Sequence, residues 1–261
     1  MSGLRLVHLP LALGPFRRWA AERDDGWTNE RDRQGRLRGV AFDEGRALHH
    51  LLSETFGKGH LQPFRLFVAP GRTNAALYGY SLVEDEELRQ NARESAMPEA
   101  LAICDPARLT AKVMPETWKE GRRLAFDVRV RPVRRLMKAG GAFSKGAEVD
   151  AFVVEAVRRF PAGPSAEESM ANSGRDREAV YREWLAERLD GAARLERVRL
   201  ASFSRHRAAR GGHVAEGPDA TLHGELVIGD PARFAERLAR GVGRHTAYGF
   251  GMLLLRPAGR R

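Results

Sequence analysis

Gly241-Val-Gly-Arg-His-Thr-Ala-Tyr-Gly-Phe-Gly-Met-Leu-Leu-Leu-Arg-Pro257 is a basic, glycine-rich segment that runs into an apolar one. Just before it, Asp230 ahead of Pro231 is typical of a helix start, because the carboxylate caps free N–H groups and proline fits the first turn. Gly241 is typical of a helix end. The sequence therefore predicts a helix over 230–240, a glycine-rich loop over 241–251 and a final strand.

The glycines of this loop permit positive φ and let a ligand approach the backbone closely, at Gly243 and Gly249 among others. Arg244 and His245 add cationic donors beside N–H groups, a combination that suits phosphate. A turn that uses glycine only for its geometry explains the same spacing. The order of the elements around the loop favours the phosphate-binding interpretation.

The remaining apolar patterns predict two halves with the same order of elements. Residues 1–115 are predicted to form strand, helix, two strands, helix and strand at 4–9, 43–56, 64–68, 76–81, 84–93 and 101–104. In residues 122–261, a strand over 122–131 precedes a helical insertion at about 139–190, which contains a Pro/Gly/Ser/Glu-rich tether over 161–173. Strands over 195–204 and 220–228 then flank a basic hairpin tip at 205–213. The predicted fold class is α+β, with tandem ferredoxin-like (RRM-like) domains.

Composition favours a polyanionic partner. The 261 residues carry a formal net charge of +10, and only Lys58, Lys112, Lys119, Lys138 and Lys145 are lysines, so most of the 44 basic residues are arginine. Arginine binds phosphate bidentately and stacks on bases, which fits RNA, although a GC-rich coding bias produces the same preference. The single cysteine excludes an internal disulfide and a cysteine-based zinc site. With neither a signal peptide nor a long apolar run, we expect a cytoplasmic protein with no membrane contact.

Residues 14–39 look too polar and too rich in glycine to form a core element. Arginines are interspersed there with Trp19 and Trp27, and positive charge interleaved with aromatic rings is typical of nucleic-acid contacts. A solvated linker is the alternative interpretation.

The terminal pattern carries a resemblance to a known family. A helix, then G-x-G-basic-x-x-A-x-G-x-G, then an apolar strand ending in proline, resembles the glycine-rich loop of the repeat-associated RAMP proteins. In detail it is most similar to the CasE-type endoribonucleases that process CRISPR RNA. The resemblance is specific at this end and extends more weakly over most of the chain. The helical insertion fits a divergent branch, such as one associated with type IV systems.

The resemblance also implies a catalytic residue. In the CasE-type family the catalytic histidine lies on a helix soon after the first strand, in a Tyr-x-Leu-His context, and here that run is Arg46-Ala-Leu-His-His-Leu-Leu52. His49 falls on the family histidine, but Arg46 replaces the tyrosine. An arginine stabilises the charge of an anionic phosphorane, but because it stays protonated it does not act as a base. We therefore assign His49 as general acid or base, with Arg23, Arg38 and Arg46 around the phosphate. An arginine-only site, with His49 a surface histidine, is the alternative.

RNA binding is expected to fall to the second half. The candidate residues come from a basic strand edge and the insertion, from the hairpin tip and from the glycine-rich loop: Arg131, Arg134, Arg135, Lys138 and Lys145; Arg205, Arg207 and Arg210; Gly243, Arg244, His245 and Gly249. Such a surface suits the phosphates and shape of an A-form stem.

The eight histidines lack metal-ligand spacing, and no nucleotide-binding fingerprint is present, so we expect no metal and no cofactor. The predicted reaction is metal-independent cleavage of a CRISPR repeat stem-loop by its own 2′-hydroxyl, leaving a 2′,3′-cyclic phosphate. The resemblance implies that the processed crRNA is retained in a CRISPR effector ribonucleoprotein complex. Two alternatives remain open: a non-catalytic RAMP subunit that holds or caps guide RNA, and an unrelated nucleic-acid-binding scaffold.

Overall fold

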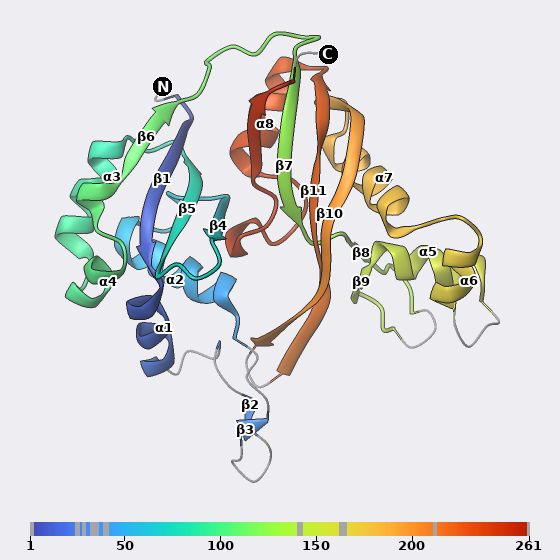
Figure 1. The fold of residues 1–261 in the computed structure, drawn as a ribbon, viewed down its shortest axis with the longest axis horizontal. Helices are drawn as coiled ribbons and strands as arrows, with labels where there is room; N and C mark the ends of the chain where they lie inside the picture. The colour runs from blue at the N-terminus through green and yellow to red at the C-terminus, as the bar shows by residue number, and fades with distance from the viewer. Residues whose placement is uncertain are drawn as a thin grey trace.

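The computed structural model describes residues 3–23, 27, 30–31, 37–38, 42–139, 143–161, 166–210 and 213–259. The chain forms two four-stranded antiparallel sheets, one from each half, as Figure 1 shows. Their strand orders are β4-β5-β1-β6 and β10-β11-β7-β12. In both sheets the first strand of its half lies between the third and the fourth. The tandem ferredoxin-like fold predicted from the sequence is therefore confirmed.

The first half follows the predicted order closely. Its elements are β1 (Arg5–Ala12), α1 (Leu13–Glu22), α2 (Glu44–Phe56), β4 (Phe64–Val68), β5 (Asn74–Ser81), α3 (Asp85–Ser95), α4 (Pro98–Ile103), η1 (Pro106–Arg108) and β6 (Thr110–Val113). Two short strands, β2 (Glu30–Arg31) and β3 (Leu37–Arg38), pair between α1 and α2. Asp43 caps α2, because its side chain accepts the Arg46 N–H at 3.0 Å, and Leu48, Leu51 and Leu52 bury one face.

The prediction that residues 14–39 contain no core element is wrong. Residues 13–22 form the helix α1, whose buried face includes Phe16, Trp19 and Ala20. Trp27 is fully buried, stacks on Trp19 with ring centroids 5.7 Å apart, and donates its indole N–H to the Ala20 carbonyl at 2.9 Å. Both tryptophans therefore stabilise the first core. They are not available to stack on bases.

The strand predicted over 101–104 is also wrong. These residues end α4, which begins with Pro98 at its first position, and Cys104 is buried behind it. The sheet is closed instead by β6, which pairs antiparallel with β1 from Arg5↔Val113 to His8↔Thr110. Four apolar residues bury equally well as a helical turn, and the proline fits the first turn of a helix.

The second half contains β7 (Arg123–Val130), β8 (Val133–Arg135), β9 (Glu148–Asp150), α5 (Ala151–Arg159), α6 (Ala166–Asn172), α7 (Arg177–Leu189), β10 (Ala193–Arg210), β11 (His213–Ile228), α8 (Pro231–Arg240), η2 (Thr246–Tyr248) and β12 (Leu253–Pro257). Residues in β7 alternate between half-buried and buried, as predicted. The four buried side chains of β7, together with Trp184 and Leu185 of α7 and Phe234 and Leu238 of α8, form the second core.

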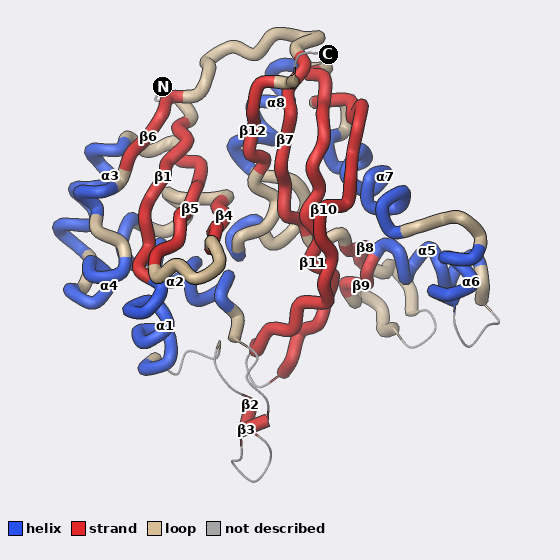
Figure 2. Tube along the Cα trace, viewed as in Figure 1, coloured by secondary structure: helices blue, strands red, loops and turns tan. Residues whose placement is uncertain are grey.

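The basic hairpin tip predicted at 205–213 is largely strand. β10 runs to Arg210, and Arg205 to Arg210 pair with Pro218 to His213 on β11. Figure 2 shows this hairpin extending well beyond the other strands of its sheet. The alternation of apolar and polar residues ends before the pairing of β10 with β11 does, because the outer part of the hairpin has no core to cover.

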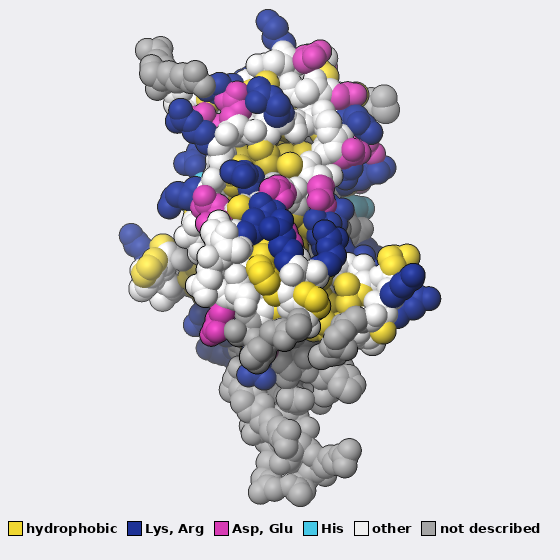
Figure 3. All heavy atoms as spheres, turned by 90° about the vertical axis from the view of Figure 1, so that its right-hand side faces the viewer, with side chains coloured by type: hydrophobic (Ala, Val, Ile, Leu, Met, Phe, Trp, Pro, Cys, Tyr) yellow, Lys and Arg dark blue, Asp and Glu magenta, His cyan; other side chains and the backbone are white. Residues whose placement is uncertain are grey.

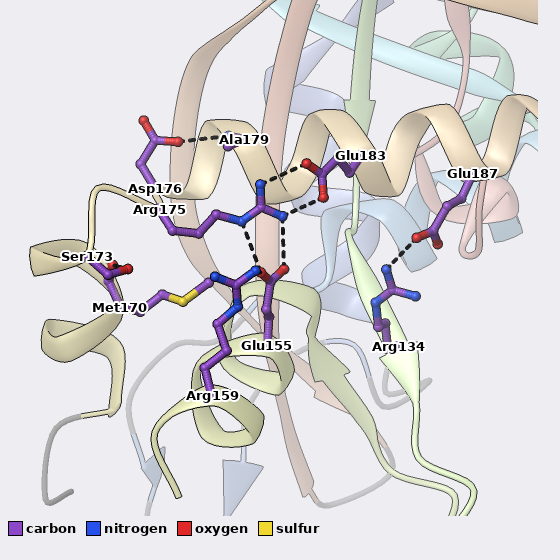
Figure 4. A network of polar contacts seen from close by, with 10 residues as sticks. All are labelled: Arg134, Glu155, Arg159, Met170, Ser173, Arg175, Asp176, Ala179, Glu183 and Glu187. Carbon is purple, nitrogen blue, oxygen red and sulfur yellow. Dashed lines mark hydrogen bonds and ion pairs between the residues drawn. The ribbon is translucent and has the colours of Figure 1, made fainter.

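The insertion predicted at about 139–190 has other bounds in the structure. It consists of β8, β9, α5 and α6, which lie beside the second sheet in Figure 1, whereas α7 packs in the core of that sheet. Part of the predicted tether over 161–173 is helical, since α6 spans Ala166–Asn172. Figure 4 shows how Arg175 ties the insertion to α7. Its guanidinium bonds Glu155 of α5 at 3.0 Å and Glu183 of α7 at 2.8 Å. This bridge holds the insertion against the domain.

The two halves contact each other through their sheets. The Tyr80 hydroxyl of β5 donates to the Leu253 carbonyl of β12 at 2.8 Å, and burial raises the pKa of that hydroxyl well above its usual value. Arg65 of β4 pairs with Asp127 of β7. Within the described residues, no helix is both long and apolar enough to span a bilayer.

Candidate active site

His49 lies where the first half meets the glycine-rich loop of the second. Its imidazole and the Tyr248 ring are in edge-to-face contact, with centroids 5.5 Å apart. One turn earlier on α2, a Cβ added to Gly45 would lie only 2.4 Å from the Tyr248 carbonyl oxygen. Helix α2 therefore rests directly on the loop at a position where a side chain does not fit.

Burial lowers the pKa of His49, and the neighbouring His50 and Lys58 lower it further. Both effects disfavour the imidazolium, since the ring is partly removed from water and faces like charge. His49 is therefore mainly neutral near neutral pH, the form that accepts a proton.

The loop itself is shaped by four glycines with positive φ, at Gly241, Gly243, Gly249 and Gly251. A Cβ at Gly243 would lie 2.7 Å from the Trp184 ring, and one at Gly251 would lie 2.4 Å from the Val242 carbonyl oxygen. Packing and backbone geometry thus account for these glycines without a ligand. The same turn places the Tyr248 ring against α2 and the His245 imidazole against β9.

Glu148 of β9 holds both basic side chains of the loop. Its carboxylate forms an ion pair with Arg244 Nε at 2.6 Å and contacts His245 Nε2 at 2.7 Å. Burial by itself would raise the pKa of Glu148, but the His245 hydrogen bond and the charges of His245, Arg244 and Arg131 lower it. The carboxylate is therefore ionised. Sequence analysis missed Glu148, because 97 positions separate it from His245.

Of the other predicted catalytic residues, Arg23 lies at the end of α1, and its guanidinium pairs with Glu54 of α2 at 2.6 Å and covers the Trp19 ring. Arg46 is on α2, one turn before His49. Arg38 is in β3, and its side chain falls outside the part of the chain that the structure describes. The structure thus brings Arg46 and His49 onto one helix and ties Arg23 to that helix.

A cavity of about 30 Å³ lies beside this junction, lined by Asp43, Glu44, Gly45, Leu48, Phe64, Leu66, Arg129, Arg131, His206, Tyr248, Gly249 and Phe250. It has room for about one water molecule. Arg129 binds both oxygens of Asp219, at 2.9 and 2.5 Å, and covers the Phe250 ring. Burial raises the pKa of Glu44 against the lowering effect of Arg129 and Arg17. These groups are structural links between α2, β7 and the hairpin.

The predicted RNA-binding residues lie in several environments. Arg131 is only 6% exposed, with its guanidinium against Gly217 of the hairpin, whereas Arg135, Lys138 and Lys145 are exposed. Arg134 pairs with Glu187 at 2.8 Å, which Figure 4 shows. Cationic and acidic side chains are interspersed on the face seen in Figure 3.

On the hairpin, Arg205 pairs with Glu167 of α6 at 3.1 Å. Arg207 is exposed and lies 3.7 Å from Glu216. The Arg210 side chain is outside the described residues. In the described ranges, no group of histidine, cysteine and acidic residues has the arrangement needed to hold a metal ion.

The comparisons with known proteins agree with this architecture. A CRISPR endoribonuclease Cse3 bound to a 19-nucleotide RNA has a TM-score of 0.61 and 21% identity, with 98% of this chain and 100% of that chain covered. Thermus thermophilus Cse3 bound to an RNA representing a pre-cleavage complex has a TM-score of 0.59 and 20% identity, with 98% of this chain and 100% of that chain covered. Cas6e from Escherichia coli str. K-12 has a TM-score of 0.53 and 17% identity, with 97% of this chain and 100% of that chain covered.

No curated protein is similar enough in sequence to match. The solved structures are similar in fold at low identity. A family model described as CRISPR associated protein matches residues 27–257, nearly the whole chain. Together with the tandem ferredoxin-like fold and the glycine-rich loop, this match shows that the chain belongs to the CRISPR associated protein family.

Proposed function

We propose that this protein is a metal-independent endoribonuclease that cleaves CRISPR repeat RNA at a stem-loop and keeps the crRNA product. The observation that carries the proposal is the contact between His49 and the glycine-rich loop, which puts a neutral imidazole beside a basic, positive-φ turn. Family membership and the likeness to RNA-bound Cse3 endoribonucleases support an RNA substrate.

The proposed reaction needs little from the protein. The 2′-hydroxyl next to the scissile phosphate attacks phosphorus, the P–O5′ bond breaks, and the products are a 2′,3′-cyclic phosphate and a 5′-hydroxyl. The protein aligns the nucleophile, takes its proton and neutralises the phosphorane charge. His49 would contribute about 10²- to 10⁴-fold as the proton acceptor, with Arg23, Arg38 and Arg46 near the phosphate.

The exposed cations Arg135, Lys138, Lys145, Arg205 and Arg207 would hold the stem through its phosphates. A tightly bound product would pass with the protein into a CRISPR effector complex in the cytoplasm. In domain terms, we assign the candidate catalytic helix to a unit of residues 1–115 and the RNA-binding surface to a unit of residues 122–261, which includes the insertion.

The test uses the repeat RNA in EDTA, alongside the same RNA with one 2′-deoxynucleotide at the scissile position. Cleavage of the first RNA and not of the second supports the proposal, because only the 2′-hydroxyl differs. Tight binding without cleavage of either RNA would overturn it in favour of a non-catalytic guide-binding subunit. Cleavage that needs added metal would also contradict it.

A further inference from the structure

His245 shares its surroundings with His49. The centroid of its imidazole lies 6.2 Å from that of the Tyr248 ring, and the same Tyr248 ring contacts His49 at 5.5 Å. One imidazole comes from α2 in the first half and the other from the loop before η2 in the second. Two titratable rings thus meet at one tyrosine.

The backbone of His245 is unusual. Its φ of 65° puts it in the left-handed region, one of two non-glycine residues with positive φ among those described. A left-handed backbone is costly for most side chains, and such residues cluster at functional sites. In a loop where four other positive-φ positions are glycine, an imidazole here points to a role for the side chain.

The carboxylate of Glu148 orients this imidazole. With Nε2 bonded to Glu148 at 2.7 Å, the ring is fixed beside an ionised carboxylate. The charged groups that face His245 include Glu148 of β9 and Arg244 of its own loop, with Tyr248 against the ring. Those that face His49 are His50 and Lys58, with Tyr248 on the other element. His245 therefore has a carboxylate partner, whereas the groups that lower the pKa of His49 are basic.

We propose that His245 is a second catalytic residue, the general acid that protonates the leaving 5′-oxygen, while His49 removes the proton of the 2′-hydroxyl. This inference rests on the proposed function. As the 2′-oxygen bonds to phosphorus, its proton passes to His49, and as the P–O5′ bond breaks, the His245 proton passes to the 5′-oxygen. His49 ends protonated and His245 neutral, and exchange with water restores both.

Glu148 is a positioning residue in this reaction. It acts through His245, because it holds the imidazolium until the leaving oxygen accepts the proton. Because Nε2 is bonded to Glu148, the proton passes to the leaving oxygen from the other ring nitrogen, Nδ1. The active site is therefore complete only when α2, the glycine-rich loop and β9 are together.

The test compares two repeat RNAs, one normal and one with sulfur in place of the 5′-oxygen at the scissile phosphate. A thiolate leaves without protonation, so a missing general acid matters only for the normal RNA. The variant is His245→Asn, because asparagine tolerates the left-handed backbone and keeps a donor toward Glu148. His8→Asn on β1 is the matched control, and His49→Asn is the second active-site variant.

We expect His245→Asn to cleave the normal RNA about 100-fold or more slowly than wild type, and the sulfur-substituted RNA within about threefold of wild type. His49→Asn should cleave both RNAs slowly, since both reactions need the proton of the 2′-hydroxyl to be removed. Glu148→Gln should slow cleavage of the normal RNA by less than His245→Asn does.

Normal cleavage by His245→Asn, or an equal loss on both RNAs, would overturn the inference and leave the proposed function standing. If wild-type protein cleaves neither RNA, the proposed function itself fails. Binding of the 2′-deoxy RNA by each variant shows whether a loss of rate is a loss of affinity.

Discussion

Gly45 offers a quantitative test of the contact between α2 and the glycine-rich loop. It is the second residue of α2, and a Cβ there would lie 2.4 Å from the Tyr248 carbonyl oxygen. An ordinary contact begins near 3.4 Å, so Gly45→Ala has to separate helix and loop by about 1 Å. A misplacement of about 1 Å costs on the order of 10²-fold in rate.

The expected effect on stability is smaller. Alanine gains about 1 kcal/mol over glycine in a helix, whereas forcing atoms into a packed contact costs about 1–3 kcal/mol. We therefore expect Gly45→Ala to lower the free energy of unfolding by about 0–2 kcal/mol and to slow cleavage by about 10²-fold.

Gly14 is the matched control. It is also the second residue of its helix, α1, and nothing lies within 4 Å of a Cβ built there. Gly14→Ala should therefore leave cleavage unchanged and stability equal or slightly higher. The assays are urea unfolding followed by tryptophan fluorescence, and single-turnover cleavage of repeat RNA. Equal rates and stabilities for the two variants would refute the reasoning that α2 rests on the loop.

Three further predictions concern the first core, His49 and the insertion. Trp27→Ala should lower the free energy of unfolding by about 3–5 kcal/mol in urea denaturation, because a fully buried ring is lost; unchanged stability with weaker RNA binding would restore the stacking interpretation. The pKa of His49 is lower in the folded state than in the unfolded state, so the unfolded state binds the proton more readily. The contribution of His49 to stability is therefore fully present above the unfolded pKa and is lost as the pH falls through the folded pKa. His49→Asn should therefore unfold with a weaker pH dependence between about pH 5 and 7, and an identical dependence in both proteins would contradict this. Arg175→Gln should lower the free energy of unfolding by about 1–3 kcal/mol, a range that allows for the exposure of Glu183 to solvent, and should speed hydrogen exchange in α5 and α6. Exchange at the wild-type rate would show that Arg175 does not hold the insertion.

Local patterns predicted those elements whose buried face is repeated over several turns or pairs. Helix α2 has a capping aspartate, a leucine stripe and Gly57 at its end, so sequence analysis found both ends. Helix α1 is short, contains Gly14 and Pro15, and carries two arginines on its exposed face, so its sequence pattern favours RNA contacts for its aromatic residues. Apolar runs of four residues, such as 101–104, do not distinguish a helical turn from a strand.

The candidate site was partly predictable for a different reason. The loop residues 241–251 and the helix with His49 each have a local pattern, and the family resemblance linked them. Their contact at Tyr248 depends on how two domains pack, and the pairing of Glu148 with His245 joins residues 97 positions apart. Neither is encoded in spacing along the chain. The loop pattern predicts phosphate contacts for Arg244 and His245 and gives no sign of their acidic partner.

The position of Glu148 has a practical consequence for studying the insertion. Glu148 begins β9, and Asp150 caps α5 two residues later by accepting the Phe152 N–H. A shortened chain without the insertion would thus also strip the carboxylate from Arg244 and His245, and any lost activity would be ambiguous. Substitutions on the outer side of α5, at the exposed Val157 and Arg158, change the surface of the insertion and leave the ion pairs of Glu148 with the loop in place.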